Sequence, residues 1–89
     1  MISHTSRRFR QAFDALPEAV QIQARQAYQL FIDNPRHPSL RFKPVHPSRP
    51  VYSARINRDY RAVGVLNGDT IVWFWIGAHS EYERIISRV

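Results

Sequence analysis

Cysteine is absent from this chain of 89 residues, and glycine occurs only three times. The lack of cysteine excludes disulfide bonds and thiolate metal sites, and it is compatible with a reducing compartment. The dispersed glycines Gly64, Gly68 and Gly77 cannot form a glycine-rich phosphate loop. The length allows one small domain, residues 1–89, whose modest core is sufficient for it to fold unaided.

Long apolar runs are missing as well. No stretch approaches the roughly 20 apolar residues that a membrane-spanning helix needs. The arginines near the N-terminus are followed by no apolar segment of the kind found in a secretory signal. We therefore expect a cytoplasmic protein without a membrane partner. The histidines lack the close spacing of metal ligands, so no metal or other cofactor is predicted. They are His4, His37, His46 and His79.

Positive charge is concentrated in the middle of the chain. The formal net charge is +6, and residues 36–61 carry seven cations against one acid, Asp59. The rest of the chain has six cations and six acids, so the whole excess lies in this segment. Its cations are Arg36, Arg41, Lys43, Arg49, Arg55, Arg58 and Arg61. Such localisation favours a polyanionic partner, either nucleic acid or an acidic protein segment, over a generally basic surface.

Three β-prone runs follow one another in the second half of the chain. Residues 51–56 alternate between two faces, while residues 60–66 and 70–76 are rich in β-branched and aromatic side chains. Asn67-Gly68 joins the last two runs and is a strong hairpin signal, because both residues tolerate positive φ. Residues 57–59 form a plausible but weaker turn, which Asp59 can close. The pattern predicts a three-stranded antiparallel meander.

Alternation along these strands assigns side chains to faces. Arg55 is placed on one face together with Val51 and Ser53. Trp73 and Trp75 are placed together on one face of the third strand. Aromatic side chains can stack on nucleic-acid bases, but on a central strand of a small sheet we expect both tryptophans in the core.

The meander has a consequence for function. The end of its first strand, the start of its second and the end of its third lie at the same end of the sheet. This topology should bring together Arg55, Arg58, Asp59, Arg61 and His79, although His79 is distant from the others in sequence. Cationic donors, a carboxylate and an imidazole are the groups that a phosphate-directed site needs.

Helical patterns flank the sheet. Apolar residues at helical spacing predict two helices between residues 5 and 34, joined near Pro17 and ended by Asn34-Pro35. The buried stripe of the second helix is expected to be Val20, Ala24, Ala27, Tyr28, Phe31 and Ile32. Residues 2–5 suit a short strand. Ser80 is expected to cap a short terminal helix that packs back on the sheet.

The segment between the second helix and the sheet, residues 35–50, contains five prolines. We expect an ordered basic loop there, with no regular structure beyond a brief turn. The chain as a whole is predicted to have an α+β fold: an N-terminal helical hairpin packed on a small antiparallel β-sheet, with a short C-terminal helix.

This order of elements resembles the RelE/ParE toxin superfamily of toxin–antitoxin systems, and two stretches of sequence resemble it as well. Residues 9–45 are similar to its helical hairpin and its "NPxHPSLxxKxL" loop. Residues 51–86 are similar to its "R-x-x-x-D-Y-R … GH" sheet core. The resemblance covers nearly the whole chain and implies the RelE-like microbial RNase fold.

The superfamily divides in function, and the resemblance implies alternatives. RelE- and YafQ-like toxins are endoribonucleases that cut mRNA, typically on the ribosome, by attack of a ribose 2′-hydroxyl on the adjacent phosphate without a metal. The leading hypothesis is therefore an mRNA interferase that inhibits translation, with mRNA, the ribosome and a cognate antitoxin as partners. ParE-like inhibition of DNA gyrase and a non-catalytic antitoxin-binding module are the alternatives.

The resemblance also suggests a role for individual residues. His79 resembles the catalytic histidine of YafQ-like toxins, where RelE has an arginine. Arg55 resembles the strand arginine that contacts the scissile phosphate, and Arg61 would assist it. Tyr82 lies near the C-terminal aromatic residue of the family, with a shorter spacing from the histidine. The proton could be moved by His79, Tyr82 or Glu83.

RNA-binding roles follow in the same way for four residues of the basic segment. Arg41 and Lys43 lie where loop-borne basic residues of the family contact mRNA or ribosomal RNA. His46 is a candidate for a second loop histidine. Arg58 stands in the turn where YafQ-like toxins have a second catalytic histidine.

Purely structural roles are the alternative for the same side chains. Arg55 could form a salt bridge with Asp59 or Glu83, and Arg61 could pair with Asp59 or Glu81. A histidine at the end of a strand could simply bond to the backbone or cap the helix that follows.

Overall fold

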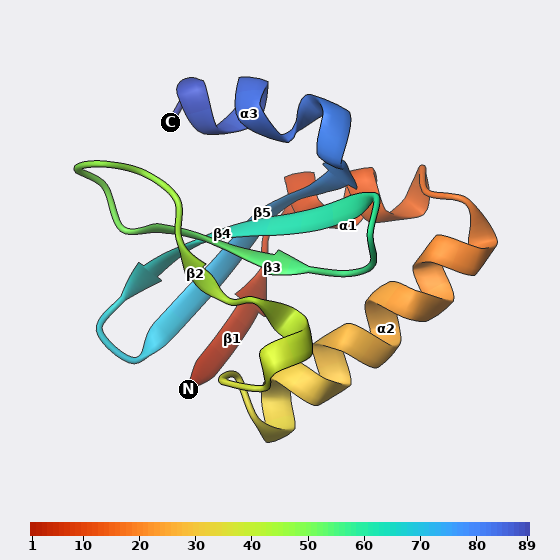
Figure 1. Ribbon diagram of the computed structural model, residues 1–89, viewed down its shortest axis with the longest axis horizontal. Helices are drawn as coiled ribbons and strands as arrows, with labels where there is room; N and C mark the ends of the chain where they lie inside the picture. The colour runs from red at the N-terminus through yellow and green to blue at the C-terminus, as the bar shows by residue number, and fades with distance from the viewer.

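Two helices cover one face of a twisted sheet and a third helix lies over the other face (Figure 1). The computed structural model describes residues 1–89. Its elements are β1 (Ile2–Thr5), α1 (Arg7–Asp14), α2 (Glu18–Asp33), the 3-10 turn η1 (Pro38–Leu40), β2 (Lys43–Pro44), β3 (Val51–Arg55), β4 (Tyr60–Asn67), β5 (Thr70–Ala78) and α3 (His79–Ser87). The predicted α+β fold is confirmed. None of the helices has the length and apolar character needed to cross a membrane.

The sheet has five strands in the order β1-β5-β4-β3-β2. Strands β3, β4 and β5 form the predicted antiparallel meander, and Gly68 turns the second hairpin with a φ of 61°. Strand β1 extends it by pairing parallel to β5. Strand β2 pairs antiparallel with β3 inside the proline-rich segment, where no strand was expected. It accommodates Pro44 because an edge strand has one side without a partner.

A β-bulge in β5 overturns the prediction that Trp73 and Trp75 share a face. Consecutive residues of β4, Val63 and Gly64, pair with Trp75 and Trp73, so Phe74 is the extra residue of the bulge. Trp73 consequently packs in the core beneath α1 and α2, while Trp75 packs beneath α3. Both tryptophans are buried, as expected.

The two N-terminal helices begin and end close to the predicted positions. Ser6 caps α1, and its Oγ accepts a hydrogen bond from the Phe9 amide at 3.1 Å. Helix α2 starts after Pro17 and ends before Asn34, whose following proline disfavours helical conformation. The buried stripe was predicted too wide, because Tyr28 and Ile32 remain 37% and 48% exposed.

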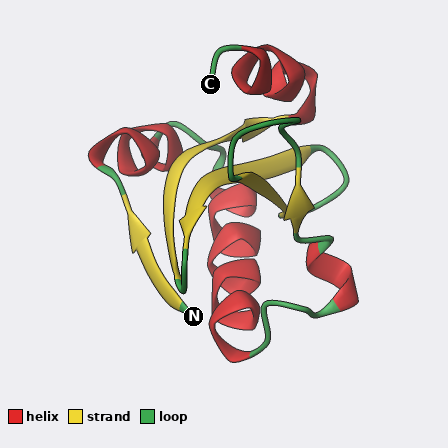
Figure 2. Cartoon of the chain, turned by 90° about the vertical axis from the view of Figure 1, so that its left-hand side faces the viewer, coloured by secondary structure: helices red, strands yellow, loops and turns green.

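The C-terminal helix starts two residues earlier than predicted. Strand pairing continues to Ala78, opposite Tyr60, and the His79 amide then donates to the Asp59 carbonyl at 2.7 Å. Ala78 is therefore the N-cap residue, and the prediction that Ser80 caps the helix is wrong. Ile85 anchors α3 against the sheet. Figure 2 shows α3 set apart from the two N-terminal helices. His79 is the first residue of α3 and directly follows Ala78, the last residue of β5.

Candidate functional site

Three arginines form a row across adjacent strand ends, which we call the arginine row: Arg41, Arg55 and Arg61. Arg55 of β3 and Arg61 of β4 are direct partners in the strand register. Arg41 lies two residues before Lys43, which pairs with Ser53 of β3, and it is near enough to Arg61 for its charge to lower the pKa of that guanidinium. Three successive segments of the chain thus supply three guanidinium groups to one end of the sheet.

The arginine row has no carboxylate partner. The only two ion pairs of the structure join the Met1 amino group to Asp69 and Arg84 to Glu81. Burial lowers the pKa of the Arg61 guanidinium, and the charges of Arg55 and Arg41 lower it further. Asp59 acts on Arg61 in the opposite direction but forms no ion pair with it. Like charges held together without an ion-paired carboxylate make the binding of an anion favourable. The suggested salt bridges of Arg55 with Asp59 or Glu83 are not formed.

Arg61 is anchored by backbone carbonyls. Its Nη1 donates to the Asn57 carbonyl at 2.6 Å and to the Tyr60 carbonyl at 2.9 Å, with a longer contact of 3.4 Å to the Arg58 carbonyl. The suggested pairing with Asp59 or Glu81 is not made. Because all three contacts use one nitrogen, Nε and Nη2 are left to bind a ligand.

Asn57 closes the β3–β4 turn, not Asp59 as predicted. Its Oδ1 accepts hydrogen bonds from the amides of Asp59 at 2.8 Å and Tyr60 at 3.0 Å. Its Nδ2 donates to Gln23 Oε1 of α2 at 2.6 Å. The position of Arg61 therefore depends on Asn57. This role of Asn57 was not predicted, although an asparagine two residues before the end of a turn is a known turn-forming signal.

His79 and Tyr82 lie beside the arginine row. The His79 amide bonds to the Asp59 carbonyl, and its exposed ring lies 5.4 Å from the Tyr82 ring, centroid to centroid. Tyr82 in turn is close enough to Arg61 to act on the pKa of its guanidinium, which it raises. The predicted assembly of strand-end arginines with His79 is confirmed. Arg58 is exposed in the adjoining turn.

The other two predicted RNA-binding residues occupy different places. Lys43 is exposed on β2, opposite Ser53. His46 lies in the loop that leads back into β3 at Val51, at the opposite end of that strand from Arg55.

The His46 ring already has a structural task. Its Nδ1 accepts hydrogen bonds from the amides of Ser48 and Arg49 at 3.2 and 3.0 Å, which holds the loop and leaves only Nε2 for a ligand. No three histidine or acidic side chains in the structure come together as a group that could hold a metal ion.

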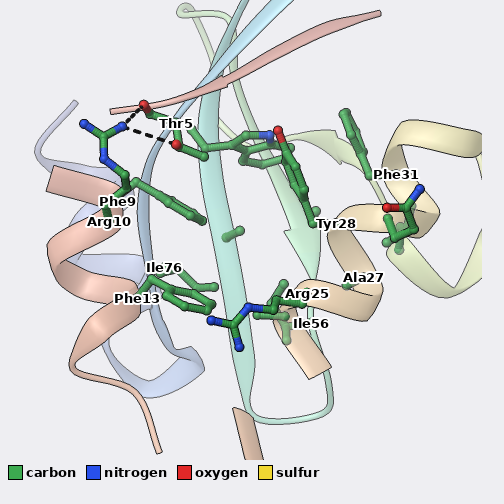
Figure 3. A pocket seen from close by; sticks show the side chains of 16 residues that line it. Thr5, Phe9, Arg10, Phe13, Arg25, Ala27, Tyr28, Phe31, Ile56 and Ile76 are labelled. Atoms are coloured by element: carbon green, nitrogen blue, oxygen red, sulfur yellow. Dashed lines mark hydrogen bonds between the residues drawn. The ribbon is translucent and has the colours of Figure 1, made fainter. Parts of the chain in front are cut away.

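An apolar cavity of about 410 Å³ lies on the opposite face of the sheet, between α1 and α2. Phe9 of α1 and Tyr28 of α2 project into it from its two sides (Figure 3). Arg10 lies at its edge and donates to the Thr5 carbonyl at 2.6 Å. The Arg25 guanidinium lies 5.0 Å from the centre of the Phe13 ring. The cavity therefore has an apolar interior and cationic side chains at its margin.

Comparison with known proteins identifies a family and a shared fold. The family model described as the ParE-like toxin domain matches residues 18–84. No curated protein sequence matches the chain.

Solved structures give the same answer for the fold. YafQ from E. coli aligns with a TM-score of 0.72 and 14% identity over 90% of this chain and 94% of its own. The RelB–RelE antitoxin–toxin complex of Methanococcus jannaschii contains a chain that aligns with a TM-score of 0.74 and 14% identity, over 92% of this chain and 96% of its own. The YoeB/ParE toxin from Agrobacterium tumefaciens aligns with a TM-score of 0.69 and 12% identity, over 89% of this chain and 99% of its own.

Proposed function

Because the chain belongs to the ParE-like toxin family of the RelE/ParE superfamily, and is thus a toxin of a toxin–antitoxin system, we propose that it is a ribosome-dependent mRNA endonuclease. The observation that carries this proposal is the arginine row, which has no acidic partner and lies beside Tyr82 and His79. Three guanidinium groups without an ion pair, next to an exposed imidazole, suit the cleavage of a phosphodiester, because they can stabilise the charge that develops on its oxygens.

The reaction would be attack of a ribose 2′-hydroxyl on the adjacent phosphate. A base removes the hydroxyl proton, the 2′-oxygen bonds to phosphorus, and the bond to the 5′-oxygen breaks as an acid protonates that oxygen. The products are a 2′,3′-cyclic phosphate and a free 5′-hydroxyl. Arg55 and Arg61 would stabilise the negative charge that develops on the phosphate oxygens.

The proton transfers would fall to the residues at the start of α3. His79 is exposed, and an imidazole can both accept and donate a proton, so it can serve as base or acid. Tyr82, whose ring neighbours both His79 and the arginine row, is the second candidate. Glu83 remains a third candidate but makes no hydrogen bond or ion pair in the structure. Arg41, Lys43, His46 and Arg58 would bind the RNA strand or ribosomal RNA.

A cognate antitoxin would silence the toxin, as a RelB antitoxin is paired with RelE in the complex from Methanococcus jannaschii. The surface sets two requirements for such a partner. It needs acidic side chains to neutralise the arginine row, and apolar side chains to fill the cavity between α1 and α2. An amphipathic acidic segment that passes over both faces would meet them.

Inhibition of DNA gyrase is the second candidate function, because the matching family model is that of the ParE-like toxin domain. The two functions predict different events in cells. An mRNA endonuclease leaves discrete cuts in translated messages, whereas a gyrase inhibitor induces the response to DNA damage and leaves mRNA intact. The non-catalytic antitoxin-binding module predicts harmless expression without the antitoxin.

Brief induction of the protein without its antitoxin distinguishes these cases. The 5′ ends of one abundant mRNA would be mapped by primer extension while a DNA-damage reporter is read in the same culture. Translation-dependent cuts without a reporter response support the endonuclease. An intact message with a strong reporter response would contradict the proposal and support inhibition of DNA gyrase instead.

A further inference from the structure

A second hollow, which we call the edge pocket, lies where η1 leads into the edge strand β2. Its volume is about 470 Å³, and none of the residues that line it is acidic. Arg36, His37 and Arg41 provide its polar groups. Phe42, Pro44 and Tyr52 are among its apolar wall residues. The pocket therefore combines positive charge with aromatic surface, and unlike the cavity between α1 and α2 it shares a residue, Arg41, with the arginine row.

The aromatic wall of the edge pocket is held rigid from behind. Tyr52 stacks on Phe42, with centroids 5.0 Å apart and planes 29° apart. Phe42 is fixed in turn by edge-on contacts with Phe31 at 5.1 Å and with Trp73 at 6.2 Å. Tyr52 is only partly buried. A partly exposed ring with a fixed orientation is a platform on which a nucleic-acid base can stack.

Arg41 connects the edge pocket to the arginine row. It lines the pocket, and its charge acts on Arg61 at the other end of the row. Arg41 is also the only residue other than glycine with a positive φ, at 45°. This left-handed backbone is unfavourable for a long side chain, and glycine or asparagine would adopt it with less strain. Strain of this kind is often found where a side chain is needed for binding.

We infer that the edge pocket binds one unpaired base of an RNA strand that passes around the β2 edge of the sheet. The pocket wall of Phe42 and Tyr52 lies on the α1/α2 side. The scissile phosphate of the same strand rests on Arg55 and Arg61, on the α3 side with Val51 and Val63. The base stacks on Tyr52, and Arg41 and Arg36 contact the phosphates between the two sites. This subsite rests on the proposed function and extends it to how the substrate is held. An acidic peptide fits the pocket less well, because the flat aromatic wall can stack on a base but cannot donate a hydrogen bond to a carboxylate from its ring face.

The test measures binding of the full-length protein to a labelled single-stranded hexaribonucleotide, 2′-O-methylated throughout so that it cannot be cut. Fluorescence anisotropy would compare the native chain with Tyr52→Ala, Tyr52→Phe and Arg36→Ala. Arg8→Ala is the matched control for loss of one charge, because Arg8 is exposed on α1, which packs on β5, across the sheet from β2. A second series would replace each nucleotide of the RNA in turn with an abasic one.

The subsite predicts that Tyr52→Ala lowers the affinity about tenfold, the usual effect of losing one stacked base. Tyr52→Phe keeps the affinity, and Arg36→Ala lowers it more than Arg8→Ala does. One abasic position should weaken binding by the native chain as much as Tyr52→Ala does, and the two changes together should add nothing further. The abasic series on the native chain decides the matter even if Tyr52→Ala fails to fold.

Two other outcomes overturn the inference in distinguishable ways. If Tyr52→Ala binds the RNA with native affinity while Arg55→Gln loses affinity, the edge pocket is not an RNA subsite, but the proposed function still stands. No binding of the free RNA by the native chain overturns the edge pocket as an RNA subsite, while the proposed function is decided separately by cleavage on ribosomes. A hexaglutamate peptide serves as the probe for the acidic alternative, and weakening of its binding alone by Tyr52→Ala would assign the pocket to a protein segment.

Discussion

Arg55 and Arg61 face each other across β3 and β4, yet only Arg61 is held by the protein. One nitrogen of Arg61 donates to carbonyls of the β3–β4 turn, whereas the Arg55 side chain makes no hydrogen bond or ion pair. The anchored guanidinium supports the turn as well as a ligand. The guanidinium group of Arg55 makes no contact that would support the fold. Substitutions at the two positions should therefore have different effects.

Replacing Arg55 with glutamine should abolish toxicity without weakening the fold. The change removes a like charge next to Arg61, so we expect the free energy of unfolding to stay within about 0.5 kcal/mol of the native value or to rise slightly. For the non-cleavable RNA, the slope of log affinity against log salt should become shallower by about 0.7, because one phosphate contact is lost. An unchanged slope would show that Arg55 touches no phosphate.

Replacing Arg61 with glutamine should reduce both RNA affinity and stability. The carbonyls of Asn57 and Tyr60 lose a charged donor, and a hydrogen bond to a charged group contributes about 1.5–3 kcal/mol. Urea unfolding should show a loss of that order for Arg61→Gln and none for Arg55→Gln. Equal stability of the two variants would mean that the contacts of Arg61 with the turn do not support the fold.

Arg41 and Gly68 offer a matched pair of substitutions, because both have left-handed backbone conformations, with φ of 45° and 61°. Arg41→Gly removes strain of about 1–2 kcal/mol, part of which is offset by the greater freedom of glycine in the unfolded chain. It should leave the unfolding free energy unchanged or raise it by up to about 1 kcal/mol. Gly68→Ala introduces the same strain and should lower stability by about 1 kcal/mol.

The two substitutions should affect RNA binding in the opposite order from stability, with Arg41→Gly the more damaging of the two. Arg41→Gly should weaken binding of the non-cleavable RNA, because a cation between the arginine row and the edge pocket is lost. Gly68 does not line the edge pocket and Gly68→Ala removes no cation, so this variant should bind RNA like the native chain. A fall in stability of Arg41→Gly would contradict the interpretation that the fold tolerates strain there for the sake of the side chain.

The end of the sheet that carries the site was predictable because its causes are local. Asn67-Gly68 fixes one hairpin, alternation fixes the face of Arg55, and meander topology then brings His79 to the same strand ends. These inferences use only turn chemistry and pairing rules, which do not depend on distant contacts.

The features that were missed depend on tertiary context. The bulge at Phe74 adds one residue to β5, and no alternation pattern reveals an extra residue, so Trp73 and Trp75 were assigned to one face. The two-residue strand β2 exists only because β3 offers it an edge. The aromatic pair of Phe42 and Tyr52 forms across that edge, so the edge pocket could not be read from the sequence.

Replacing His79 with alanine should abolish toxicity and leave the protein folded. Its ring is exposed and makes no hydrogen bond, and only its backbone amide bonds to Asp59, so the loss of stability should remain within about 0.5 kcal/mol. Growth after induction and thermal unfolding would be measured side by side. Toxicity that survives in a folded His79→Ala protein would leave Tyr82 and Glu83 as the proton-transfer candidates.

Cleavage of a defined mRNA on purified, programmed ribosomes tests the central claim most directly. The message would be prepared both unmodified and with a single 2′-O-methyl group at the nucleotide before the cut. The proposed chemistry predicts one cut with a 5′-hydroxyl end, which is lost in the methylated message and lost again when Arg55→Gln replaces the native protein. An intact message on ribosomes, from a protein that still arrests growth, would contradict it.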